Sequence, residues 1–166
     1  MFFNSYTSSQ SQTRDLIDSF YYKIVNVSRN KAFYDKLLVP DTIDGRYDLL
    51  MLFSIILTFN LSKCGSIGRD LSQNLFDKIF IDLDLSLREL GAGDAGVHIK
   101  IKQMINLYMG RQEVYCNCLI NKDFDKFKKH IIKNVYRNVD DFGNSPSLLV
   151  EYCKKIFVQF ENKNDE

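Results

Sequence analysis

The side chains best suited to chemistry are five carboxylates that fall close together in the sequence: Asp77, Asp82, Asp84, Glu89 and Asp94. Asp82 and Glu89 align on one edge of an expected helix, and such a pair could act as general acid and base. Residues seven positions apart are separated by ~10 Å along a helix axis, which is wide for one reaction. Nothing else in the chain marks a substrate pocket, so the carboxylates do not favour an enzyme.

Histidine and cysteine also lack the spacings that chemistry requires. The two histidines, His98 and His130, are not part of a Glu-x-x-His pattern, which a di-iron helical bundle would contain. Cys116 and Cys118 are two positions apart in a helical pattern and therefore face apart, so buried thiols are a better interpretation than a metal site. No serine or cysteine lies in a recognisable nucleophile motif. We expect no catalytic residue, no metal and no cofactor.

The composition indicates one all-α domain. The chain has 166 residues, a usual length for a single domain, with 45% apolar and 26% charged residues. Its net charge of +1 gives no bulk field that would favour DNA binding. The two prolines, Pro40 and Pro146, both lie between helical patterns. We predict a single-domain bundle of about six to seven helices over residues 13–160, with a mobile tail at 1–12 and a polar tail at 161–166.

Apolar periodicity places the helices that build this bundle. They are expected at residues 13–29, around 32–37, and at 46–63, 70–90, 97–120, 122–138 and 146–160. The run Leu49–Leu61 is too short for a membrane span, which needs ~20 residues, and is expected to be a buried core helix. Cys64–Gly68 is predicted to be a short flexible connection. The start of the chain does not resemble a secretory signal, so an intracellular protein is expected.

The expected helix at 70–90 carries apolar residues on two sides. Its broad face is predicted to pack in the core and comprises Leu75, Phe76, Ile79, Phe80, Leu83, Leu87 and Leu90. Asp84 and Arg88 are spaced for an ion pair on another face. Ile81 and Leu85 lie away from the core face. Two interpretations are open for them: a surface for a partner, or, as is more common, packing against a further helix of this domain.

A glycine-rich turn at 91–96 separates that helix from the next. Gly91 suits the left-handed position after a helix, and Asp94 suits the N-cap of the following helix. No strand or GxxxxGK pattern accompanies these glycines, so they do not indicate a phosphate cradle.

The helix at 97–120 has an arginine in its apolar seam. Arg111 occupies a seam position and needs a partner, because an unpaired buried charge is very costly. Asp82 and Glu89 are the carboxylates expected nearest to it, and Gly110 is predicted to permit close helix approach. Whether Arg111 is an internal clamp or a contact for a partner stays open.

Residues 121–138 form the most basic stretch of the chain. Six cations against two carboxylates give this stretch a charge of +4: Lys122, Lys126, Lys128, Lys129, Lys133 and Arg137 against Asp123 and Asp125. Such a helix could lie near a membrane surface or ribosomal RNA. A solvated helix face is the more common explanation of a run of this kind.

Several segments together resemble a known family. Residues 39–46 read VPDTIDGR, residues 87–94 read LRELGAGD, and Tyr108 is followed by Gly110-Arg111. In this order and spacing, they are similar to the ubiquinol–cytochrome c chaperone family over roughly residues 20–155.

The resemblance implies a non-enzymatic assembly chaperone. Such a protein would bind newly made cytochrome b and support assembly of ubiquinol–cytochrome c reductase, in some cases with a small partner subunit and the ribosome. It implies a place in the bacterial cytoplasm, peripheral at the inner membrane, or on the matrix side of the mitochondrial inner membrane. The rival function is a peripheral membrane or lipid-binding protein that uses Leu49–Leu61 and the basic helix.

The polar residues of the matched segments and their neighbours are expected to form the main region for partner binding. They are Arg46, Asp48, Asp82, Asp84, Arg88, Glu89, Asp94, Tyr108 and Arg111.

Overall fold

The chain folds into seven helices and no strand within the residues that the structure describes. This structure is a computed structural model, and it describes residues 3–91, 93–137 and 139–161. The helices are α1 (Phe3–Ser28), α2 (Lys31–Asp35), α3 (Ile43–Ser62), α4 (Gly65–Glu89), α5 (Asp94–Ile120), α6 (Phe124–Val135) and α7 (Ser145–Glu161). The prediction of an all-α bundle with six to seven helices is confirmed.

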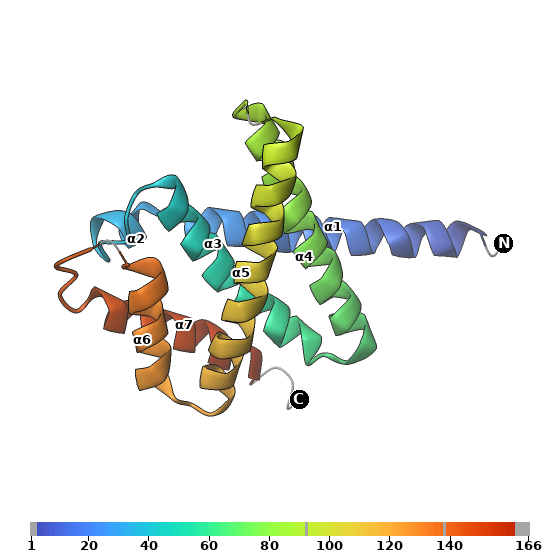
Figure 1. Ribbon diagram of the computed structural model, residues 1–166. Coiled ribbons are helices and arrows are strands. Elements are labelled where there is room, and N and C mark those ends of the chain that lie inside the picture. The colour runs from blue at the N-terminus through green and yellow to red at the C-terminus, as the bar shows by residue number, and fades with distance from the viewer. Residues whose placement is uncertain (1–2, 92, 138, 162–166) are drawn as a thin grey trace.

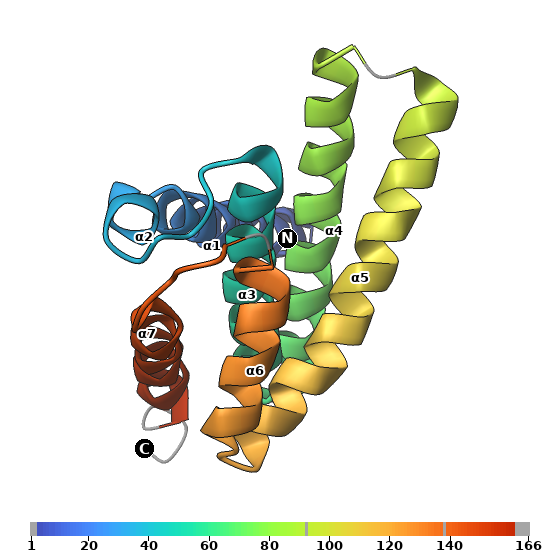
Figure 2. The same cartoon turned by 60° about the vertical axis from the view of Figure 1, so that its left-hand side comes forward.

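Helix α3 lies at the centre of the bundle. It packs against α1, α4, α5, α6 and α7 (Figure 1). Helices α4 and α5 form a long antiparallel pair whose connected ends extend beyond the other helices (Figure 2). Helix α1 crosses α3 and α4, and its first turns project away from the bundle (Figure 1). The end of the α4–α5 pair therefore has neighbours on fewer sides than the rest of the fold.

The sequence of α3 explains its central place. Its apolar residues lie all around the helix axis, and Leu49, Leu52, Ile55 and Ile56 are completely buried. Its buried hydroxyl groups bond within the helix, as Thr58 does to the carbonyl of Ser54 at 2.9 Å. The expectation of a buried core helix is confirmed. No helix among the described residues is long and apolar enough to cross a membrane.

Helices α1 and α4 begin well before the residues that the apolar pattern predicts. Helix α1 starts at Phe3 rather than residue 13, so residues 3–12 are helical and the predicted start of this helix is wrong. Periodicity could not detect this part because it consists mostly of Ser, Gln and other polar residues. Helix α4 starts at Gly65, so Cys64–Gly68 is not a flexible connection. Residues 1–2 and 162–166 of the predicted tails lie outside the described part.

The turn between α4 and α5 differs from prediction in one detail. Gly91 has a φ of 85°, the left-handed conformation expected after a helix. The N-cap of α5 is Gly93, and Asp94 is already inside the helix, so its predicted capping role is wrong. The carboxylate of Asp94, in the first turn of α5, is still stabilised by the positive end of the helix dipole.

Burial along α4 changes toward its C-terminal end. Leu75, Ile79 and Phe80 are buried, whereas Leu90 is 72% exposed because the helix has passed beyond the core. Its predicted place on the core face is therefore wrong. Ile81 and Leu85 are 58% and 53% exposed, so they do not pack against a further helix of this domain. The interpretation that Ile81 and Leu85 pack within the domain is therefore wrong, and the two residues form an exposed apolar patch.

Three of the four cysteines belong to the core. Cys116, Cys118 and Cys153 are buried, while Cys64 is exposed. Burial raises the pKa of the Cys116 thiol to about 12, which keeps it protonated. The interpretation of Cys116 and Cys118 as buried thiols is confirmed.

Candidate functional site

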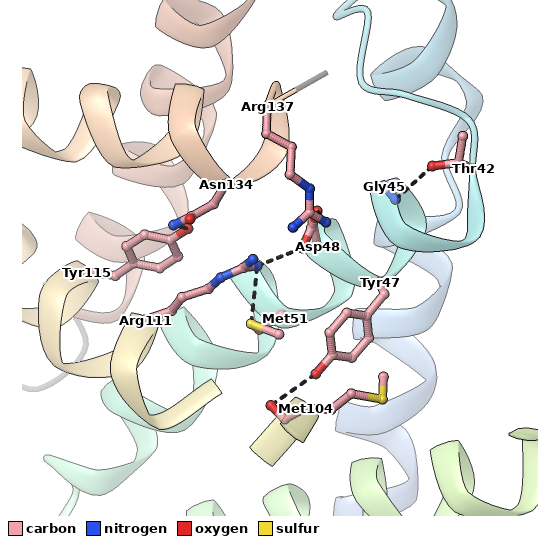
Figure 3. Close-up of polar contacts among 10 residues, drawn as sticks. All are labelled: Thr42, Gly45, Tyr47, Asp48, Met51, Met104, Arg111, Tyr115, Asn134 and Arg137. Carbon is pink, nitrogen blue, oxygen red and sulfur yellow. Dashed lines mark hydrogen bonds and ion pairs between the residues drawn. The ribbon is translucent and has the colours of Figure 1, made fainter. Parts of the chain in front are cut away.

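A buried carboxylate connects three helices on one side of the bundle. Asp48, in the second turn of α3, is only 2% exposed. Its Oδ1 accepts a hydrogen bond from Nη1 of Arg111 at 2.7 Å, and its Oδ2 accepts one from Nη2 of Arg137 at 2.6 Å. Figure 3 shows the guanidinium groups reaching Asp48 from α5 and from the end of α6. We call Asp48, Arg111 and Arg137 the Asp48 cluster.

The Asp48 cluster corrects the expected partner of Arg111. Neither Asp82 nor Glu89 pairs with it; Asp82 lies 3.6 Å from Nζ of Lys78 on its own helix. The reason is that α5 also packs on α3, and its seam there meets Asp48. Arg111 is 8% exposed, and its Nη1 also contacts Sδ of Met51 at 3.3 Å. Arg111 is thus an internal clamp between α3 and α5.

Two opposing effects act on the acidity of Asp48. Burial raises the pKa of its carboxyl group, and the two guanidinium groups oppose that rise. Short hydrogen bonds from both arginines stabilise the charged carboxylate.

A groove opens beside the Asp48 cluster. It encloses about 560 Å³ between α1, the start of α3, the C-terminal half of α4 and the N-terminal half of α5. We call it the α4–α5 groove. Its apolar lining includes Val25, Ile43, Leu50, Leu83, Leu87, Leu90, Met104 and Leu107. Its polar lining includes Arg29, Asp44, Arg46, Tyr47, Asp82, Lys100 and the three residues of the Asp48 cluster.

Hydrogen bonds fix the wall of the groove beside α3. Thr42 caps this helix by accepting a bond from the Gly45 amide at 3.1 Å. Tyr47, one turn on, donates from its hydroxyl to the carbonyl of Met104 on α5 at 3.3 Å (Figure 3). The start of α3 is thereby held against α5 at two levels, by Tyr47 and by Asp48.

The structure separates the predicted site residues into three groups. Arg46, Asp48, Asp82 and Arg111 all line the α4–α5 groove. Asp84, Arg88 and Asp94 meet at the turn between α4 and α5. There Nε of Arg88 lies 2.5 Å from Oδ1 of Asp84, the predicted ion pair, and Nη1 contacts Asp94.

The third group, Glu89 and Tyr108, lies outside the groove. Glu89 is exposed. Tyr108 is 2% exposed, and its hydroxyl lies 2.9 Å from that of Thr58, so it is a core residue. The prediction that it belongs to a binding surface does not fit this burial.

Sequence reasoning missed Arg137, Arg29 and Lys100 as residues of the groove. Arg137 was grouped with the basic stretch at 121–138, although it follows the end of α6 at Val135. The sequence offered no signal for this role, because the helix expected at 122–138 includes Arg137, whereas α6 ends before it.

Gly110 does not have the role that its neighbour Arg111 suggested. A Cβ atom added there would meet no atom within 4 Å, so the prediction of close helix approach is wrong. Gly110 lies on an exposed side of α5, one position away from the seam.

Comparison with known proteins identifies the family. The sequence profile described as ubiquinol-cytochrome C chaperone matches residues 35–166, which include α3 to α7 and most of the groove. The chain belongs to this chaperone family. Its fold is also similar to the crystal structure of the Cbp3 homolog from Brucella abortus, with a TM-score of 0.86 and 26% identity. That match covers 96% of this chain and 88% of the Brucella chain. No protein with curated annotation matches this chaperone in sequence.

Proposed function

We propose that this chain is a non-enzymatic chaperone that binds newly made cytochrome b and supports assembly of ubiquinol–cytochrome c reductase. The α4–α5 groove carries this proposal, together with membership of the chaperone family. The groove combines an apolar lining with a charged rim, and a binding site for an apolar segment with polar ends needs both.

The exposed apolar residues around the groove suit a membrane-protein client. Ile43 and Leu90 are 73% and 72% exposed at its rim, and Leu107 is 50% exposed. Cytochrome b is a polytopic membrane protein, so its segments present large apolar faces before they enter the bilayer. Binding would remove the apolar faces of the client and the apolar rim of the groove from water, which favours the complex.

Further partners and the cellular place follow from the same proposal. Ile81 and Leu85 are exposed on α4 and do not line the groove, so they offer a separate surface for a small partner subunit. Contact with the ribosome would bring the chaperone to its client during synthesis. We place the protein in the bacterial cytoplasm at the inner membrane, with the matrix side of the mitochondrial inner membrane as the alternative.

The rival function, a peripheral lipid-binding protein, loses one of its two supports. Leu49–Leu61 is buried at the centre of the bundle and is not available to lipid. The basic helix α6 remains, but a basic surface alone does not explain an apolar groove on another side of the fold.

Capture of cytochrome b tests the groove directly. We expect Leu107→Asp to weaken co-purification of cytochrome b from membranes at least about tenfold, since it places a charge against the apolar client surface. The measurement is affinity purification of the tagged chaperone from cells, with quantification of cytochrome b in the eluate. Arg88→Ala, at the turn between α4 and α5, should also reduce capture, but less.

A matched control lies two residues further along α5. Met109 is also 50% exposed and does not line the groove, so Met109→Asp should leave capture unchanged. Circular dichroism establishes that each variant is folded. Equal capture by folded Leu107→Asp and Met109→Asp would contradict the groove as the client site.

A further inference from the structure

Helix α6 presents a row of lysines along its outer edge. Lys126, Lys129 and Lys133 are exposed and fall within an arc of about 60° on the helix, and exposed Lys122 precedes them. We call these four residues the lysine row. From Lys126 to Lys133 it extends along the helix for roughly 10 Å, at 1.5 Å per residue.

The opposite side of α6 fixes the direction of the lysine row. Phe127 and Ile131 are completely buried, and Val135 is 1% exposed. These residues anchor α6 in the core, so the helix cannot roll and the row must face solvent. Because the apolar face of α6 is buried in the core, it cannot insert into a lipid bilayer.

Nearby carboxylates do not neutralise the lysine row. Among the described residues, none of the ion pairs within 4 Å includes these four lysines. Asp123 caps α6 by accepting from the Lys126 amide at 3.0 Å, and Glu151 of the adjacent α7 pairs with Lys154. The row therefore presents concentrated positive charge on a chain whose net charge is only +1.

His130 lies in the positive electrostatic field of the lysine row. It lies on α6 between two lysines of the row, and burial, Lys126 and Lys133 all lower the pKa of its imidazole. His130 is therefore neutral at neutral pH, and the charge of this edge comes from the lysines alone.

We propose that the lysine row binds the anionic headgroup surface of a lipid bilayer and holds the chaperone with α6 flat on the membrane. This inference deepens the proposed function, because it orients the chaperone on the membrane into which its client is inserted. A row of exposed cations along one anchored helix fits a planar anionic surface, which several lysines can approach at once. Binding is electrostatic and reversible, because α6 has no exposed apolar face to insert.

RNA is a less suitable partner for this edge. Single-stranded RNA is usually bound by exposed aromatic rings placed between basic residues. The two aromatic residues of α6 do not serve this purpose: Phe127 is buried, and Lys154 of α7 covers the ring of Phe124, with Nζ 4.4 Å from its centroid.

Vesicle flotation tests the lysine row with the full chain. The chaperone should float with phosphatidylcholine vesicles that contain about 30% phosphatidylglycerol, but not with pure phosphatidylcholine, and salt of roughly 0.5 M should release it. One lysine near an anionic surface strengthens binding about fivefold, so Lys126→Glu/Lys129→Glu/Lys133→Glu should weaken binding at least about a hundredfold.

A charge-matched variant separates the row from net charge. Lys23, Lys36 and Lys102 are exposed on other parts of the chain, so Lys23→Glu/Lys36→Glu/Lys102→Glu should change binding only a few-fold. Equal loss in both triple variants, or no binding by the wild type at low salt, would overturn the proposal. Tighter binding to an RNA than to the anionic vesicles, lost in the α6 variant, would overturn the choice of lipid.

Client capture separates this inference from the proposed function. The α6 triple variant should still co-purify cytochrome b from detergent extracts, because the lysine row lies outside the groove. If vesicle binding fails while capture by the wild type persists, only the membrane contact is wrong. If capture fails while the row binds vesicles, the proposed client is wrong and the membrane contact stands.

Discussion

Replacing Asp48 with alanine is expected to lower the free energy of unfolding by about 3–5 kcal/mol, the usual cost of breaking a buried ion pair from one side. Arg111 would remain buried at 8% exposure without its carboxylate. Arg137 is 39% exposed and would turn to water, so most of the loss comes from Arg111. At roughly 2–4 °C per kcal/mol for a chain of this size, the melting temperature should fall about 10 °C.

Urea unfolding of Asp48→Ala measures this loss, and Asp44→Ala is its control. Asp44 is an exposed carboxylate in the first turn of the same helix, so its removal should cost less than about 1 kcal/mol through the helix dipole. If the two variants unfold at the same urea concentration, the Asp48 cluster does not hold α3 to α5.

A double variant distinguishes the loss of a partner from the value of the ion pair itself. Asp48→Leu/Arg111→Met removes both buried charges and keeps apolar volume, so it should be more stable than Asp48→Ala. A double variant less stable than Asp48→Ala would mean that the ion pair itself stabilises the fold more than apolar packing can.

The elements of this fold were predictable where apolar residues repeat without interruption. Helix α3 could be placed from Leu49–Leu61 because its composition allows only a buried helix of that length. The seam of α5 was predictable because apolar residues recur there at helical spacing: Val97, Tyr115 and Cys118 are buried, and Ile101 and Met104 are half-buried. Helix starts were less predictable, because the first turns of α1 and α4 are mostly polar in sequence and leave no periodic apolar signal.

The site could be predicted only in part, since its pairings join distant parts of the chain. The sequence indicated that Arg111 needs a buried partner, but helix phasing relates only residues near one another. Its partner Asp48 is 63 positions away and depends on how α3 crosses α5. In a helix expected at 46–63, Asp48 would lie in the first turn, where a carboxylate is favoured by the helix dipole and requires no partner. Tyr108 was assigned to the surface because it belongs to a family motif, and motif membership does not distinguish core residues from binding residues.

Gly45, in the motif VPDTIDGR, should tolerate no side chain. A Cβ atom there would lie 2.0 Å from the backbone oxygen of Pro40, because the capped turn at Thr42 folds the chain back on the first turn of α3. Backbone cannot move aside as the end of a flexible side chain can, so Gly45→Ala should destabilise the fold by about 3 kcal/mol. The displaced turn would also move Tyr47 and Asp48, which hold α3 against α5.

Gly110→Ala makes the same chemical change, but we expect it to raise the free energy of unfolding rather than lower it. Gly110 has open space around its Cα and lies in the middle of α5, so alanine should stabilise the protein by about 1 kcal/mol through helix propensity. Thermal unfolding of the two variants beside the wild type measures both effects at once. A melting temperature for Gly45→Ala at or above that of the wild type would show that the motif glycine is not required by packing.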